Sequence, residues 1–184
     1  MLEDCRKLNR LKGALQFREV PPRDEWKDWR IACVDGSDSP QVSERVGLRY
    51  GVYAAGYMIF QEGNLEDEDY LSGGFFHEQA GDPESTEKLL RLLTTKLERE
   101  VALLCLKEKD ADLILIDGSF FGFRAGCSSI RNKALNYGPY AKASELIDDV
   151  RDLTIELLES RRAVGIVKRV RTSAIDGWIA SKWG

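Results

Sequence analysis

Two apolar runs in this chain end in the same tripeptide, Asp-Gly-Ser, and this repeat constrains the fold more than any other feature. The first run reads IACVDGS (31–37) and the second reads LILIDGS (113–119). A short apolar run before a turn signal is typical of a strand that is buried on both faces. Open α/β sheets form their ligand sites at the carboxyl ends of such strands. Asp35 and Asp117 therefore come close together if the two strands are parallel neighbours.

The apolar pattern of the whole chain predicts a mixed α/β sheet with flanking helices. The acidic run EGNLEDEDY (62–70) is expected to be a solvated loop between two strands, and RNKALNYGPYAK (131–142) a second loop. The elements are expected in the order strand, strand, strand, helix, strand, helix, strand, over residues 31–34, 46–60, 70–79, 82–104, 112–117, 143–160 and 163–169.

The chain of 184 residues suits one domain with an appendage. Residues 1–20 have leucines at helical spacing, and the segment PPRDEWKDW (21–29) ends that pattern. The organisation predicted from this is a helical N-terminal appendage over 1–29 and one main domain over 30–184.

Composition narrows the class of protein. No apolar run approaches the ~20 residues of a membrane span, and the N-terminus lacks the apolar core of a secretory signal. The four cysteines form no CxxC pair, which argues against a thiolate zinc site and favours reduced thiols in the cytoplasm. The net charge of −4 counts mildly against nucleic acid as a partner, although the run 161–171 is locally basic.

The two strand-end aspartates have two interpretations. Asp-Gly is a common turn in which the carboxylate bonds its own backbone, and each copy alone fits that description. Two copies at equivalent strand ends favour a functional pair instead. Carboxylates held close together repel unless a cation neutralises them, and hard oxygen ligands suit Mg²⁺ or Mn²⁺. Asp35 and Asp117 are therefore predicted metal ligands.

A third acidic ligand is sought on the long helix between the two strands. With Leu97 at the centre of the leucine stripe and about 100° per residue, Glu100 lies about 60° from the centre and Glu98 about 100°. Glu100 is therefore the predicted inward carboxylate, with Glu98 as the fallback. The alternative is that Glu100 lies beside the core without a role.

The order Asp-strand, two strands, Glu-helix, Asp-strand is that of the ribonuclease H-like fold. Together with the motifs VDGS (34–37), LILIDGS (113–119) and AVGIVKR (163–169), it makes the chain resemble the NurA nuclease family over roughly residues 30–170. The resemblance implies a ribonuclease H-like core and a manganese-dependent DNA end nuclease active in double-strand break repair. It also implies a homodimer that works with the hexameric ATPase HerA.

By position, Asp35, Glu100 and Asp117 match the family's metal carboxylates, with Mn²⁺ or Mg²⁺ as the cofactor. Lys168 matches the basic residue of the last motif, for which a phosphate contact is the implied role. Family members continue past that motif to a segment with a histidine near the metals, so the chain is expected to be short at its C-terminus. Its single histidine, His77, falls in the third predicted strand, where a structural role is expected.

Other readings of the sequence remain. A NurA-like domain that is catalytically incomplete would serve in assembly or in DNA binding. An actin-like phosphotransferase needs further glycines around its phosphate loops, and GSDSPQ after Asp35 fits this poorly. A haloacid-dehalogenase-type phosphatase needs an Asp two residues after its nucleophile, whereas Asp38 follows Asp35 by three.

Overall fold

The structure, a computed structural model, describes residues 19, 22–39, 43–45, 48–78 and 83–167. The chain divides into the unit Lys27–Lys168 and a second unit made of Met1–Trp26 and Arg169–Gly184. Of the second unit, the described part is Glu19, Pro22 and the 3-10 turn η1 (Arg23–Glu25) with Trp26. The helix predicted over 1–20 lies outside the described residues.

The unit Lys27–Lys168 is built on a six-stranded sheet. Its strands are β1 (Ile31–Asp38), β2 (Ser43–Arg45), β3 (Leu48–Gln61), β4 (Asn64–Glu78), β5 (Leu113–Asp117) and β8 (Ala163–Ile166). They lie in the order β2-β3-β1-β5-β8, with β4 paired to β3. β1, β5 and β8 are parallel, whereas β3 is antiparallel to β1 and to β4. This order confirms the predicted ribonuclease H-like α/β class.

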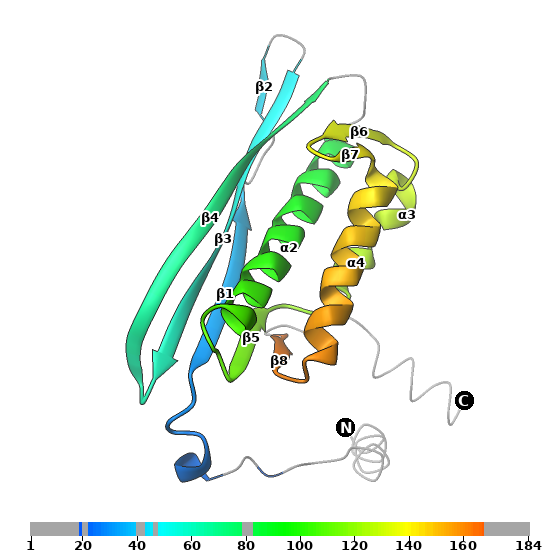
Figure 1. Cartoon of the computed structure of the whole chain (residues 1–184). Helices are drawn as coiled ribbons and strands as arrows, with labels where there is room; N and C mark the ends of the chain where they lie inside the picture. The colour runs from blue at the N-terminus through cyan, green and yellow to red at the C-terminus, as the bar shows by residue number, and fades with distance from the viewer. Residues whose placement is uncertain (1–18, 20–21, 40–42, 46–47, 79–82, 168–184) are drawn as a thin grey trace, which may run out of the picture. The chain divides into compact units, whose positions relative to one another are not determined.

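Two helices lie on one face of the sheet (Figure 1). Helix α2 (Pro83–Lys107) packs against β1, β3 and β5, and α4 (Ala143–Glu159) packs against α2. Between β5 and α4 the chain forms the 3-10 turn η2 (Gly122–Arg124), the short helix α3 (Cys127–Ile130) and the hairpin β6 (Ala134–Tyr137) and β7 (Tyr140–Lys142). None of the described helices is long and apolar enough to cross a membrane.

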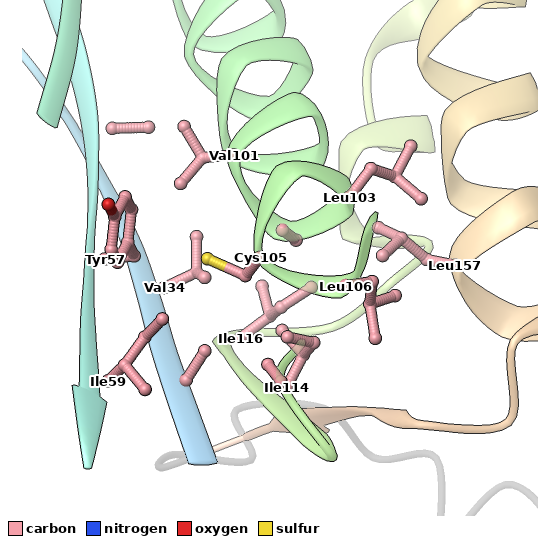
Figure 2. Close-up of a cluster of buried hydrophobic side chains, with 14 residues drawn as sticks. Val34, Tyr57, Ile59, Val101, Leu103, Cys105, Leu106, Ile114, Ile116 and Leu157 are labelled. Atoms are coloured by element: carbon pink, nitrogen blue, oxygen red, sulfur yellow. The ribbon is translucent and has the colours of Figure 1, made fainter. Parts of the chain in front are cut away.

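The core beneath the strand ends combines alternate strand residues with one side of α2. Ala32 and Val34 of β1, and Ile114 and Ile116 of β5, are buried against the helix, as Figure 2 shows for three of them. Cys105 of α2 points its sulfur toward Val34 in the same view. Each fully buried aliphatic side chain contributes about 1.5–3 kcal/mol, so this cluster holds β1 and β5 firmly in register.

Two predicted loops are strands. The acidic run belongs to β4, because β3 and β4 pair continuously from Leu48 opposite Glu78 to Gln61 opposite Asn64. The turn between them is only Glu62–Gly63, where both residues have positive φ. Most of these carboxylates are exposed to solvent on an edge strand, whereas Asp67 is partly buried and pairs with Lys109 at 3.0 Å. The segment 131–142 likewise contains the β6–β7 hairpin.

Candidate active site

Asp35 and Asp117 lie side by side on neighbouring parallel strands. The register pairs Val34 with Ile116, so the next residue of each strand is one of the two aspartates. Asp117 is the last residue of β5. Asp35 is inside its strand rather than beyond it, because β1 continues to Asp38 alongside β3. Both aspartates line one cavity of about 490 Å³, together with Cys33, Gly56, Met58, Leu115 and Ile166.

Glu98 reaches the strand end from the helix side, through the space left by Gly36. A Cβ atom on Gly36 would lie 2.6 Å from Cγ of Glu98 and 2.9 Å from Cγ2 of Thr94. The backbone N–H of Gly36 hydrogen-bonds the Glu98 carboxylate. Glycine is required at position 36 because any side chain would displace Glu98. This explains the glycine of the first Asp-Gly-Ser motif.

Burial and like charge both act on Glu98. Its side chain is only 13% exposed. Burial is the largest cause that raises its pKa, to about 7; Arg99 lowers the pKa, and the charges of Asp35 and Asp117 raise it further. The part of the shift that comes from Asp35 and Asp117 shows that Arg99 compensates the negative charge of this region only in part. Such a set of hard oxygen donors fits a divalent cation.

Arg99 is a site residue that the sequence did not indicate. Its side chain is 2% exposed, its Nη1 lies 3.7 Å from Oε2 of Glu98, and its guanidinium lies 5.5 Å from the ring centre of Phe120. Nε and Nη1 have no hydrogen-bond acceptor within the part of the chain that the structure describes. In the sequence, an arginine beside a glutamate in a charged helix segment is expected to be exposed to solvent. Its burial is seen only in the packed structure.

Glu100 does not join the two aspartates. It forms an ion pair with Lys96 one turn earlier and lines a separate cavity of about 150 Å³ with Tyr53, Tyr137 and Tyr140. The predicted inward position of Glu100 is therefore corrected to Glu98.

The physical reason is that the leucine stripe of α2 serves two contacts, the sheet and α4. The residues that face the sheet, Thr94, Val101 and Cys105, lie about 40–80° from Leu97, on the side of Glu98, at about 100° per residue.

The remaining predicted residues cannot be placed. Lys168 lies outside the described residues, and nothing is described of the His77 side chain in β4. Among the described residues, no three His, Cys, Asp or Glu side chains already stand in the arrangement of metal ligands. Asp35, Glu98 and Asp117 are thus an electrostatic cluster in this conformation, and their predicted role as ligands stays a prediction.

The sequence profile of the NurA domain family matches residues 30–178. The chain belongs to the NurA domain family. Comparison with curated protein sequences found no match.

Solved structures are similar to the chain as well. The NurA nuclease from Sulfolobus solfataricus has a TM-score of 0.54 at 19% identity, over 78% of this chain and 49% of that one. A NurA structure with manganese has a TM-score of 0.45 at 18% identity, over 99% and 44%. The chain therefore spans about half the length of these solved structures. At these identities the first similarity shows the fold of the NurA domain.

The last NurA motif, AVGI in β8, is explained by backbone packing against the second Asp-Gly-Ser. A Cβ atom on Gly165 would lie 2.6 Å from the carbonyl oxygen of Gly118, which is backbone and cannot move aside cheaply. The Gly118 amide donates to the carbonyl of Ile166 at 2.9 Å. The motif thus fixes the turn that follows Asp117, and its glycine is structural.

Proposed function

We propose that this NurA domain is a divalent-metal-dependent DNA nuclease that hydrolyses phosphodiester bonds at Asp35, Glu98 and Asp117. The observation that supports the proposal most is the place of Glu98, a largely buried carboxyl group that reaches the strand ends over Gly36. Burial, and after it the charges of Asp35 and Asp117, raise the pKa of Glu98 to about 7. Mn²⁺ or Mg²⁺ suits three oxygen donors of this kind. The nuclease family and the manganese in a similar solved structure agree with this choice.

The residues of the chain divide the work. One or two divalent ions supply Lewis acidity at a phosphodiester group when bound. Asp35 and Asp117 are held by the paired strands β1 and β5, so their backbone is set before any ligand arrives. Glu98 approaches over Gly36, and the neighbouring Arg99 offsets part of the negative charge. Lys168, by its place in the last motif, is proposed to contact phosphate.

The test compares cleavage of end-labelled single-stranded and duplex DNA by the native chain and by Asp117→Asn, with Mn²⁺ present. We expect the substitution to lower the rate by about 100-fold or more, since losing even a residue that only supports a metal ligand costs about 10–100-fold. Asp152→Asn, on the exposed side of α4, is the matched control and should cleave at the native rate. Equal residual cleavage by the native chain and Asp117→Asn would overturn the proposal.

A second candidate is an incomplete NurA domain that binds DNA or assembles without cleaving it. It is favoured by the lack of a ready ligand arrangement among the described residues. Calorimetric titration with Mn²⁺ separates the two functions. The nuclease requires binding that Glu98→Gln weakens, whereas the incomplete domain shows no such binding and no cleavage.

Assembly is the last part of the proposal. Family membership suggests a homodimer that works with a HerA-type hexameric ATPase. Light scattering on the purified chain measures the first point, and co-elution with the purified ATPase measures the second. A monomer at all concentrations, or separate elution of the two proteins, would contradict the corresponding part.

A further inference from the structure

A second cavity, of about 350 Å³, lies between helix α2 and the segment η2–α3 that follows β5. From α2 it is lined by Lys88, Arg91 and Thr95, above the buried Leu92. From the other side it is lined by small residues, Gly122, Ala125 and Gly126, and by Phe123 and Cys127. We call this cavity the α2 groove. None of its lining residues is acidic, although the chain as a whole carries a charge of −4.

The cations of the α2 groove are available to an anionic ligand. The Arg91 guanidinium is exposed and makes no ion pair or hydrogen bond with any described residue. The Nζ atom of Lys88 lies 2.6 Å from Oε1 of Glu84 and donates a hydrogen bond to Oγ of Ser129 at 3.1 Å. The Glu84 side chain is nevertheless 75% exposed. Exposed pairs of this kind contribute about 0–1 kcal/mol, so a phosphate group can replace Glu84 as the partner of Lys88 at little cost.

The wall opposite the cations allows close approach to the backbone. Gly126 adopts a φ of +84°, and a Cβ there would lie 3.2 Å from Cε of Lys88. The lysine stem therefore passes directly over the glycine. Small residues at such a wall let a ligand approach the backbone closely, although the amides of Gly122 and Ala125 already donate to the carbonyls of Ser119 and Gly122.

The α2 groove is aligned with the candidate active site. Arg91 and Glu98 are seven residues apart, which places them on the same side of α2, separated by about 10 Å along its axis. Along the axis of a DNA duplex each strand rises about 3.4 Å per phosphate, so a strand rises by about three nucleotides over this distance. On the other wall, η2 begins five residues after Asp117. The groove is thus formed by the helix that carries Glu98 and by the segment that follows the strand of Asp117.

We propose that the α2 groove binds the sugar–phosphate backbone of the DNA strand whose cleaved bond lies at Asp35, Glu98 and Asp117. This rests on the proposed nuclease function for the position of the strand, but not for the binding itself. Lys88 and Arg91 pair with phosphates about two or three nucleotides from the cleaved bond. Phe123, which is partly exposed in the lining, offers a ring on which a base can stack.

The test measures binding of a fluorescein-labelled single-stranded oligonucleotide by fluorescence anisotropy, in EDTA, so that cleavage plays no part. We expect Arg91→Glu to weaken binding about 10-fold. The double variant that carries both Lys88→Glu and Arg91→Glu should bind more weakly still. The slope of log affinity against log salt should fall by about one for each cation removed. The matched control is Arg151→Glu on α4, an exposed arginine paired with Asp148 and Asp152. It should bind with the native affinity within about 2-fold.

The outcomes separate this inference from the proposed function. Native affinity in Arg91→Glu, an equal loss in Arg151→Glu, or no binding by the native chain each overturns the groove. A native chain that binds oligonucleotide through Arg91 but does not cleave DNA with Mn²⁺ supports the groove and overturns the nuclease. Circular-dichroism melting of all variants shows that they are folded, and Arg91→Lys, which retains the charge, should recover most of the affinity.

Discussion

The two Asp-Gly-Ser motifs are identical in sequence and differ in structure. In the first, Gly36 is extended within β1, and its missing side chain makes room for Glu98. In the second, Gly118 has a φ of +93° and no heavy atom within 4 Å of the place where a Cβ would stand. Gly36 is needed because there is no space for a side chain, and Gly118 is needed because its backbone has a positive φ. What the two copies share is the aspartate, which in each follows the last residue pair of the parallel strands β1 and β5.

The largest expected effect tests which helix acid belongs to the first motif. Glu98→Gln should reduce Mn²⁺-dependent DNA cleavage about 100-fold, because the buried carboxylate beside Asp35 and Asp117 loses its charge. Glu100→Gln is the matched control, since it changes the same side chain two residues away in the Lys96 pair, and its rate should stay within about 3-fold. Initial rates on end-labelled DNA decide the matter. A greater loss in Glu100→Gln would restore the original assignment.

Next in size is a change that fills the space at the first glycine. Gly36→Ala should lower the free energy of unfolding by about 1–3 kcal/mol, the usual cost of overpacking. It should also remove cleavage, because the new methyl group takes the place of Glu98 Cγ. Denaturant unfolding and initial rates measure the two effects. An alanine variant with native stability and native rate would show that Glu98 does not depend on this gap.

A smaller effect is expected at the second glycine, and asparagine sharpens the contrast. Gly118→Ala should cost about 1–2 kcal/mol, because a Cβ disfavours positive φ. Gly118→Asn should cost less than Gly118→Ala, since asparagine tolerates that conformation and the space is open. At Gly36 the order should reverse, with asparagine worse than alanine. Thermal unfolding of the four variants gives the ranking, and the same order at both positions would mean that the glycines are equivalent.

The last contrast between the motifs is a pH dependence that only the first motif confers. Burial and the two aspartates raise the pKa of Glu98 from 4.5 to about 7 in the metal-free protein. The folded state then binds a proton more tightly than the unfolded state, so this group favours folding below about pH 4.5. That contribution is lost as the pH rises through about 7. Stability measured in EDTA between pH 5 and 8 should therefore fall less in Glu98→Gln than in the native chain. Parallel curves of stability against pH for the native chain and Glu98→Gln would contradict this prediction.

Much of the fold follows from the sequence, because hydrophobic period and strand-end turns are local signals. The parallel pair β1 and β5, the long helix α2 and the last strand β8 were all predictable from apolar runs and their order. The acidic part of β4 was not, because long-range pairing with β3 decides its conformation and exposed carboxylates tolerate a strand as readily as a loop. The β6–β7 hairpin is equally dependent on its neighbours, since Tyr137 donates to the carbonyl of Gly74.

The site was predictable only in part. The neighbouring positions of Asp35 and Asp117 could be predicted because each follows an apolar run, and their role as ligands stays a prediction. The acidic residue of α2 nearest the strand ends could not be identified from the leucine stripe. The stripe contains residues that face the sheet and residues that face α4, so its centre does not point at the sheet. Arg99 and the α2 groove depend on tertiary packing against the segment after β5, and no period or motif in the sequence reports that contact.

The burial of Arg99 beside Glu98 also determines the net charge of the candidate site. When all three carboxylates are ionised, one guanidinium leaves two negative charges, which a single divalent cation cancels. A second cation would leave the site positive unless an anion arrives with it. If the proposed site holds divalent ions, Asp35, Glu98 and Asp117 would be close to neutral with one ion, and the charge of a second would need a phosphate group of the DNA to balance it.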